Sequence, residues 1–164
     1  MLEFLRSLGQ GAGEPNGDMS LFHSTTENAG PVTLTDKESV VALLFLVVTA
    51  DGNIAPEEEE LVIAASNRMK LLRVLAIPEF NAIVLKVRDG IDTKGRAEVF
   101  AAALKGLPAD LGETVYALAG DIVSADGTVE AAEISFLREI QEALGISDEL
   151  ATKVLEVMRI KNRG

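Results

Sequence analysis

The spacing of apolar residues predicts a protein built from helices alone. In most segments apolar residues recur every three or four positions, which is the spacing of a helix that buries one face. No segment alternates apolar and polar residues over six or more positions, so strands are not expected. Residues 40–48 are apolar on every side, and the helix that contains them is therefore expected at the centre of a bundle.

Capping and helix-breaking residues set the expected boundaries. Thr35 and Glu38 form a capping box, in which each side chain pairs with an amide group at the start of a helix. Pro56 suits the first position of the next helix, and Asp89-Gly90 is expected to stop a later one. The expected helices are residues 36–50, 56–75, 79–88, 93–105, 109–125, 131–144 and 148–161.

The last two helices have clear end signals. Gly145 is expected as a C-cap and Ser147 as the N-cap of the final helix. Helical spacing also predicts which residues share the inward faces. These residues are Phe80, Ile83, Val84, Val87, Ala97, Phe100, Leu104, Ile134, Leu137, Ile140 and Leu144.

The chain contains an internal repeat. Residues 50–58 begin with Ala-Asp-Gly and end with Glu, and residues 125–133 do the same 75 positions later. Over residues 38–66 nine positions are identical at this offset, whereas composition alone gives roughly two. Residues 84, 85 and 87 match residues 154, 155 and 157 at an offset of 70. We therefore predict a duplication with three helices in each half.

The predicted architecture is an all-α, compact bundle of about seven to eight helices with internal duplication and pseudo-two-fold symmetry. A flexible N-terminal arm is expected at residues 1–34, where residues 1–8 have an amphipathic pattern and residues 9–31 hold five Gly and two Pro. The helical domain is expected at residues 35–164. It divides into repeat one at about 36–88, a connecting helix at about 92–106 and repeat two at about 109–161.

Composition and charge exclude several classes of functional site and partner. A chain of 164 residues suits one domain, and its 48% of hydrophobic residues favours closely packed helices. Absence of cysteine excludes disulfides, thiolate metal sites and a cysteine nucleophile. A formal charge of -11 argues against a nucleic-acid partner and favours cations or basic protein surfaces.

Targeting and catalytic signals are missing from the sequence. The N-terminus lacks the pattern of a signal peptide, and the longest uncharged apolar run has eleven residues where about 20 are needed to span a membrane. We expect a cytoplasmic protein that is not membrane-spanning. The only histidine, His23, lies outside the predicted helices, and serine-hydrolase, phosphate-loop and dinucleotide motifs are absent, so no enzyme is expected.

The repeated motif is an Asp-Gly turn followed by Glu at the third helical position. Asp51 and Glu58 hold these places in the first copy, and Asp126 and Glu133 in the second. Capping alone can explain one copy, because such carboxylates stabilise a helix start by about 1 kcal/mol each. The motif also matches the second half of an EF-hand loop, but the acidic residues of the first half are missing, which excludes an ordinary EF-hand.

A divalent cation is the sharper interpretation. If the pseudo-two-fold axis brings the two turns together, Asp51, Glu58, Asp126 and Glu133 pool four carboxylates, and two charges about 5 Å apart repel by about 3 kcal/mol at an effective dielectric near 20. Asp121 lies on an otherwise apolar helix about one turn before Asp126 and needs a partner. These five residues are the predicted metal ligands, for calcium, magnesium, manganese or zinc.

The paired Ala-Asp-Gly-x-(Ile/Val)-x-x-x-Glu turns, each behind an apolar helix, resemble the TerB family of tellurite-resistance proteins over residues 36–161. This resemblance implies a helical bundle with an acidic cluster proposed to bind metal, matched here by Asp51, Glu58, Asp126 and Glu133. It also implies cytoplasmic work with other tellurite-resistance and stress-response proteins, some of them membrane-associated, without catalysis. The Gly-rich arm and Asp121 depart from the family pattern.

Two functions therefore stay open. The first is a cation-binding module whose occupancy adjusts the packing of two helical halves and hence the surface shown to a partner. The second is an acidic scaffold or adaptor that binds partners without metal.

Overall fold

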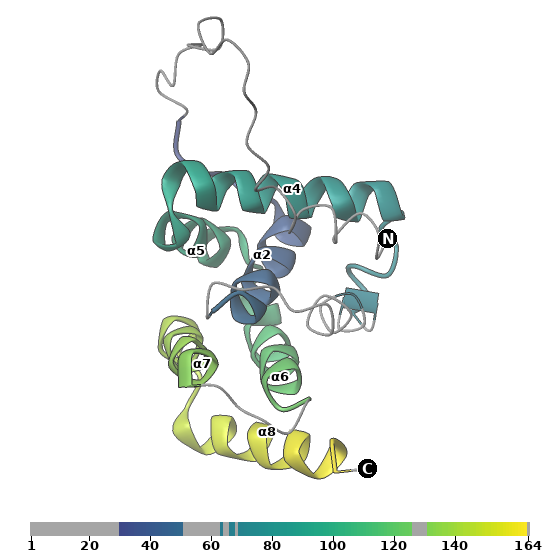
Figure 1. The fold of residues 1–164 in the computed structure, drawn as a ribbon. Coiled ribbons are helices and arrows are strands. Elements are labelled where there is room, and N and C mark those ends of the chain that lie inside the picture. The colour runs from purple at the N-terminus through teal and green to yellow at the C-terminus, as the bar shows by residue number, and fades with distance from the viewer. Residues whose placement is uncertain (1–29, 51–62, 64–65, 68, 126–130, 164) are drawn as a thin grey trace, which may run out of the picture.

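The computed structural model describes residues 30–50, 63, 66–67, 69–125 and 131–163. This part of the chain forms six α-helices and a short 3-10 helix, η1, without a strand, so the predicted all-α class is confirmed (Figure 1). None of the described helices is long and apolar enough to cross a membrane. The total of seven to eight helices and the pseudo-two-fold axis stay predictions. The elements are α2 (Asp36–Val48), α4 (Ile77–Lys94), α5 (Arg96–Gly106), η1 (Ala109–Leu111), α6 (Gly112–Val123), α7 (Ala131–Leu144) and α8 (Asp148–Lys161).

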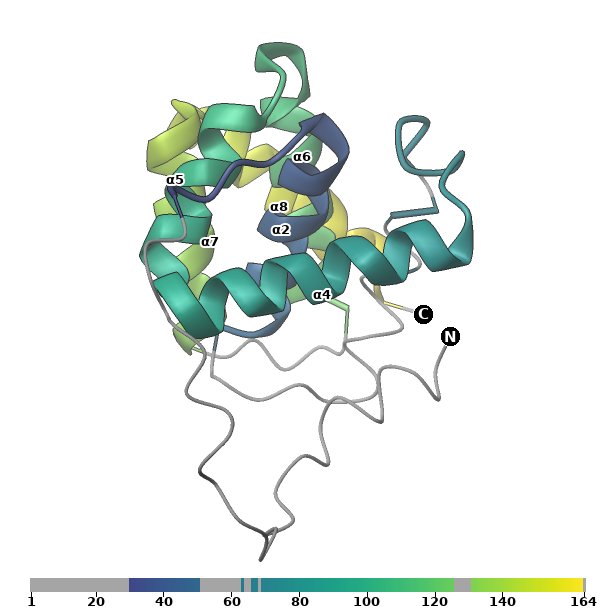
Figure 2. The same ribbon diagram turned by 90° about the horizontal axis from the view of Figure 1, so that it is seen from above.

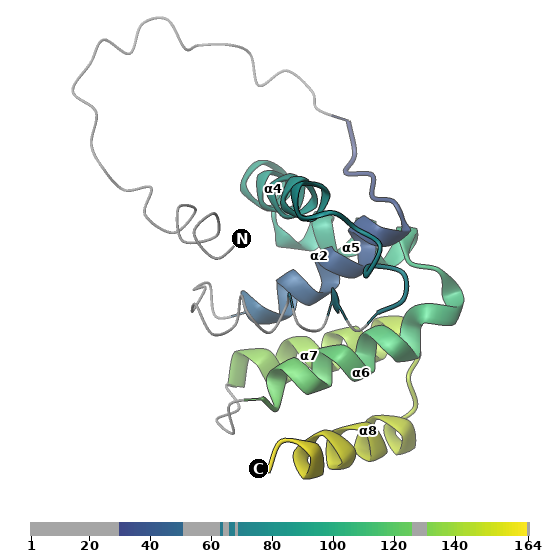
Figure 3. The same cartoon turned by 90° about the vertical axis from the view of Figure 1, so that its right-hand side faces the viewer.

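Helix α2 is the centre of the fold, as its sequence predicts. All residues from Val40 to Val48 are buried, because α4, α5, α6 and α7 pack around the helix. Figure 3 shows α4 on one side of α2, α5 at the level of α2, α6 and α7 on the other side, and α8 beyond α6 as the outermost layer. The predicted capping box is present at the start of α2, where Thr35 N–H donates to Glu38 Oε2 at 2.8 Å.

Helix α4 is longer than its predicted span of residues 79–88. Asp89-Gly90 does not stop it, because Gly90 is a buried helical residue that lets α5 pack closely: an added Cβ would lie 3.1 Å from Val99 Cγ2. The helix ends instead at Gly95, whose φ of 90° lies in a region that favours glycine. Helix α4 begins at Ile77, two residues before the predicted start, with Pro78 in its first turn.

Helix α5 consequently begins at Arg96 rather than at residue 93. It lies beside both α2 and α4 (Figure 2), so its buried side is formed by Val99, Phe100 and Ala103. The prediction that Ala97 faces inward was wrong, because this residue is exposed. Residues 109–125 are likewise not one helix, since the 3-10 turn η1 precedes α6.

The predicted bounds of α7 and α8 are both confirmed. Gly145 has a φ of 66° and Ile146 N–H donates back to Gln141 O at 3.0 Å, which is the hydrogen bond that closes a Schellman C-cap. The Ser147 hydroxyl then accepts from Leu150 N–H at 3.3 Å as the N-cap of α8. One inward prediction was wrong: Ile134 on α7 is 41% exposed.

Candidate functional site

The two helices that precede the Asp-Gly turns end in the same way. Thr49 N–H donates to Phe45 O at 3.1 Å at the end of α2, and Ser124 N–H donates to Gly120 O at 3.2 Å at the end of α6. In both copies the next residue donates to the carbonyl three positions back, at 3.1 Å. Each of these pairs is related by the offset of 75, so the backbone agrees with the sequence repeat up to the first residue of each motif.

Both helix ends lie at one edge of the molecule. Helices α2 and α6 run side by side in the same direction, and in Figure 3 their C-terminal ends are both on the left, where α7 begins. The described chain therefore enters both Asp-Gly turns from the same edge.

Arg96 binds the end of α2. Its Nη1 donates to Thr49 O and to Thr49 Oγ1, both at 2.8 Å, and its Nη2 donates to Leu46 O at 2.8 Å. The last carbonyls of a helix have no partner within the helix and carry the negative end of its dipole, so a guanidinium group suits them. Arg96 thus fixes the backbone immediately before the first Asp-Gly turn.

The same guanidinium also contacts the second half of the protein. Its Cζ lies 5.4 Å from the centroid of the Phe136 ring on α7, in a cation–π arrangement. Phe136 in turn packs against Phe100 of α5, with ring centroids 5.3 Å apart. Because Glu133 lies about one helical turn before Phe136, Arg96 connects the end of α2 to the first turns of α7.

Asp121 has the partner that its position requires. Lys161 Nζ lies 2.5 Å from Asp121 Oδ1, and Asn162 Nδ2 donates to the same oxygen at 3.2 Å. The Asp121 side chain is only 12% exposed, so this pairing avoids a buried, uncompensated charge. It also joins the end of α8 to the end of α6.

The structure describes two of the five predicted metal ligands. Glu133 is half-buried in the first turn of α7, and Asp121 is paired with Lys161. Asp51, Glu58 and Asp126 lie outside the described residues. Among the residues that are described, no group of three or more acidic or histidine side chains is placed to hold a metal ion. The chemistry of the predicted set fits a hard cation, because every ligand is a carboxylate.

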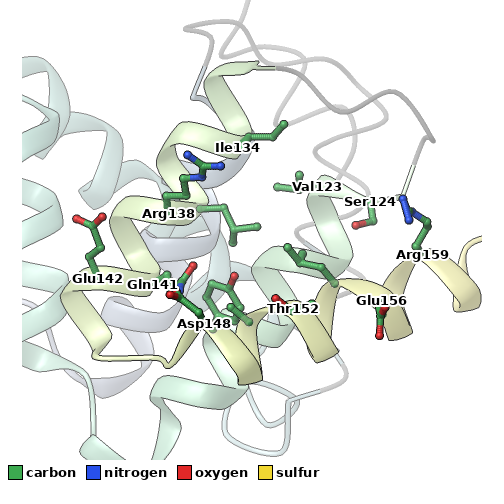
Figure 4. Close-up of a pocket in the computed structure, with 14 residues that line it drawn as sticks. Val123, Ser124, Ile134, Arg138, Gln141, Glu142, Asp148, Thr152, Glu156 and Arg159 are labelled. Carbon is green, nitrogen blue, oxygen red and sulfur yellow. The ribbon is translucent and has the colours of Figure 1, made fainter.

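A groove of about 990 Å³ adjoins this edge. Helix α6 forms its floor and α7 and α8 form its two walls (Figure 4). Val123 and Ser124 line it immediately before the second Asp-Gly turn. The apolar residues that line the groove are Tyr116, Val123, Ile134, Leu137, Ala151 and Leu155.

Sequence patterns did not identify Arg96, Phe136 or the groove. The position of Arg96 in the sequence gave one indication of its role. A positive charge in the first turn of a helix is unfavourable to the helix dipole, so such a residue is expected to have a partner in another element. The groove has no local signal, since its walls come together only when α7 and α8 both pack on α6.

Comparison with known protein families identifies a relationship. A protein-family model described as Tellurite resistance protein TerB matches residues 37–154, from the first turn of α2 to the middle of α8. The predicted resemblance to this family is confirmed over residues 37–154. No curated protein and no solved structure matches the sequence.

Proposed function

The chain belongs to the TerB family of tellurite-resistance proteins, and from this premise we propose that it is a non-enzymatic module that binds a divalent cation and docks partner proteins. Its ligands are the turn carboxylates Asp51, Glu58, Asp126 and Glu133. Its partners are other tellurite-resistance or stress-response proteins in the cytoplasm, some of them membrane-associated.

The common edge of α2 and α6 is the observation that carries this proposal. Two helices with the same terminal hydrogen bonds lead into two acidic motifs from one side of the molecule. Carboxylates that approach one another need protons or a cation, and oxygen ligands suit calcium, magnesium or manganese. Zinc also accepts carboxylate oxygens, although it more often takes nitrogen or sulfur.

Through the contacts of Arg96, cation binding near the end of α2 would also affect the position of α7. Arg96 hydrogen-bonds the end of α2 and covers Phe136, so it links the end of α2, immediately before the first motif, to the early part of α7. We propose that cation occupancy adjusts how the two helical halves pack and thereby changes the surface that a partner meets.

Thermal unfolding with each cation tests the proposal. Calcium, magnesium, manganese and zinc are added singly at constant ionic strength, since screening alone stabilises a chain with a net charge of -11. A bound cation at 100 times its dissociation constant raises the free energy of unfolding by about 2.7 kcal/mol. Asp51→Asn with Asp126→Asn is expected to remove this stabilisation. Asp89→Asn with Asp92→Asn, two exposed residues of α4, is the control for charge and should retain it.

The alternative is an acidic scaffold that binds partners without metal, which the net charge of -11 favours. If none of the four cations raises the melting temperature of the wild-type protein above that of the control salt, the cation proposal is wrong and the scaffold is preferred.

A further inference from the structure

The groove between α6, α7 and α8 has the size and form to hold a chain segment. Its volume of about 990 Å³ lies at the upper end of the range for small-molecule sites. Helices α7 and α8 both pack on α6 and diverge from the turn that joins them, so the space between them widens away from this turn (Figure 4). Each wall helix has 14 residues.

The groove has an apolar surface that the hydrophobic face of a bound segment could cover. Ile134 on the α7 wall is 41% exposed, whereas Leu137 and Ala151 deeper in the groove are almost completely buried. Burying an exposed isoleucine against such a floor is favourable, because apolar area is removed from water. Tyr116 also lines the groove, and its hydroxyl, which is protonated at neutral pH, can donate a hydrogen bond.

Two arginines line the groove away from the turn between α7 and α8. Arg138, about midway along α7, and Arg159, near the end of α8, stand on opposite walls, and Arg159 lies near Ser124 (Figure 4). No described residue forms an ion pair with either guanidinium group. Two arginines without an ion-pair partner in the described part of the chain are, on a protein of net charge -11, a local site for carboxylates.

The end of the groove beside the turn between α7 and α8 carries acidic groups. Glu142 is exposed there, and Asp148 accepts a hydrogen bond from Gln141 Nε2 at 2.8 Å. Glu156 also borders the groove, but its carboxylate points away from α7 (Figure 4). Glu142 and Asp148 therefore lie close to the α7–α8 turn, whereas the two arginines lie farther from this turn on both walls.

We propose that the groove binds an amphipathic helix of a partner protein, with an acidic C-terminal turn between Arg138 and Arg159. The apolar face of this helix packs on Ile134 and Leu155, in the manner of a helix bound in a groove. Its dipole agrees with this orientation, since the negative C-terminus lies near the arginines and the positive N-terminus near Glu142. This inference rests on the part of the proposed function that concerns partner docking, and not on cation binding.

A pair of designed peptides tests the proposal by NMR on the isotope-labelled full chain. Both are 14-residue amphipathic helices with blocked ends and leucines at helical spacing; one has three glutamates in its last turn and the other three lysines. The glutamate peptide is expected to shift the signals of Ile134, Thr152 and Leu155. Arg138→Glu with Arg159→Glu should weaken its binding by about tenfold or more and should strengthen binding of the lysine peptide.

A matched variant controls for net charge. Arg73→Glu with Arg163→Glu makes the same charge change at two exposed positions outside the groove and should alter the affinity for either peptide by less than about twofold. If the groove signals do not move, or if both charge-reversed variants behave alike, the proposal is overturned.

Two other occupants are outcomes of the same experiment. Nuclear Overhauser contacts between groove methyls and residues 1–8 in the free protein would assign the groove to the chain's own N-terminal segment. Groove shifts that depend on protein concentration alone would assign it to a second copy. Either result would overturn the partner helix. Thermal stabilisation by cations is measured separately, so loss of peptide binding with intact cation stabilisation contradicts only the groove proposal.

Discussion

Arg96 of α5 contacts both the end of α2 and α7, and no motif in the sequence predicts these contacts. Its three hydrogen bonds go to Leu46 of α2 and to the C-cap residue Thr49, and its flat face covers Phe136 of α7. Only a guanidinium group has the forked donors and the planar surface to make both kinds of contact together. A position that looks like an unfavourable helix start is thus explained by contacts that are remote in sequence.

Replacing Arg96 tests this role. Arg96→Met keeps most of the apolar side chain but leaves the carbonyls of Leu46 and Thr49 without their donor, so the free energy of unfolding should fall by about 3 kcal/mol. Arg96→Lys should recover less than half of this loss, because a lysine ammonium cannot make the forked contact. Urea unfolding measures both. The control Arg73→Met, at an exposed arginine, should change stability by less than about 0.5 kcal/mol.

Glu38 makes stability depend on pH. Burial alone would raise its pKa, but hydrogen bonds from Lys86 and Thr35 outweigh burial and hold the pKa below the ordinary value of 4.5. A carboxyl group whose pKa is lowered by folding stabilises the protein above its unfolded pKa and loses this effect as the pH falls through its folded pKa. Glu38 should therefore contribute fully above pH 4.5 and progressively less below it.

The substitution Glu38→Gln isolates this contribution. Near pH 7 it should lower the free energy of unfolding by about 1 kcal/mol, mainly through loss of the Lys86 ion pair, since glutamine retains part of the capping box. The difference from the wild type should shrink below pH 4.5, as measured by urea unfolding at decreasing pH. A difference that stays constant down to pH 3 would contradict the assignment. Glu139→Gln, at an exposed position of α7, is the control.

At the scale of elements, the sequence predicts helix ends well where local chemistry decides them. The bounds of α7 and α8 follow from Gly145 and Ser147, whose roles depend only on their own backbone. The error in α4 has the opposite cause. Gly90 looks like a helix stop, but it is a helical glycine kept small by the approach of Val99 from α5, and a contact between elements is invisible in local sequence.

Gly106 provides a test of close packing between elements. A Cβ at this position would meet Leu34 O at 2.5 Å and would also clash with the buried Ser39 hydroxyl, and the backbone oxygen cannot rotate away. Gly106→Ala should therefore lower the free energy of unfolding by about 2 kcal/mol despite the higher helix propensity of alanine. The matched change Gly112→Ala meets only Leu144, at 3.8 Å, and should be neutral or slightly stabilising. Equal effects of the two changes in thermal unfolding would contradict this account.

At the scale of the whole molecule, the repeat in the sequence predicts which segments correspond but not what joins them. The matching ends of α2 and α6 agree with the nine identities of the repeat. The joining residues lie elsewhere: Arg96 is on α5, which belongs to neither repeat, and the groove is formed when two walls meet over α6. The candidate acidic residues could be named from sequence, whereas their surroundings depend on tertiary packing.

The two halves of the molecule are expected to be coupled through their acidic motifs. If both acidic motifs share one site, Asp51 and Glu133 repel each other in the metal-free protein, and removing either charge relieves the same repulsion. Asp51→Asn and Glu133→Gln should then be non-additive by about 1 kcal/mol or more in a double-mutant cycle of urea unfolding in chelator, whereas independent sites add within about 0.5 kcal/mol.

A second cycle supplies the comparison for this coupling. Glu113 lies at the opposite end of α6 from the motif, so Asp51→Asn with Glu113→Gln should be additive. A saturating concentration of cation should change the coupling energy between Asp51 and Glu133, because both would bind the same cation. The coupling energy between Asp51 and Glu113 should stay the same. Additivity of both cycles in chelator would mean that each motif only caps its own helix, and the acidic residues would then contribute to solubility and partner binding rather than to a shared cation site.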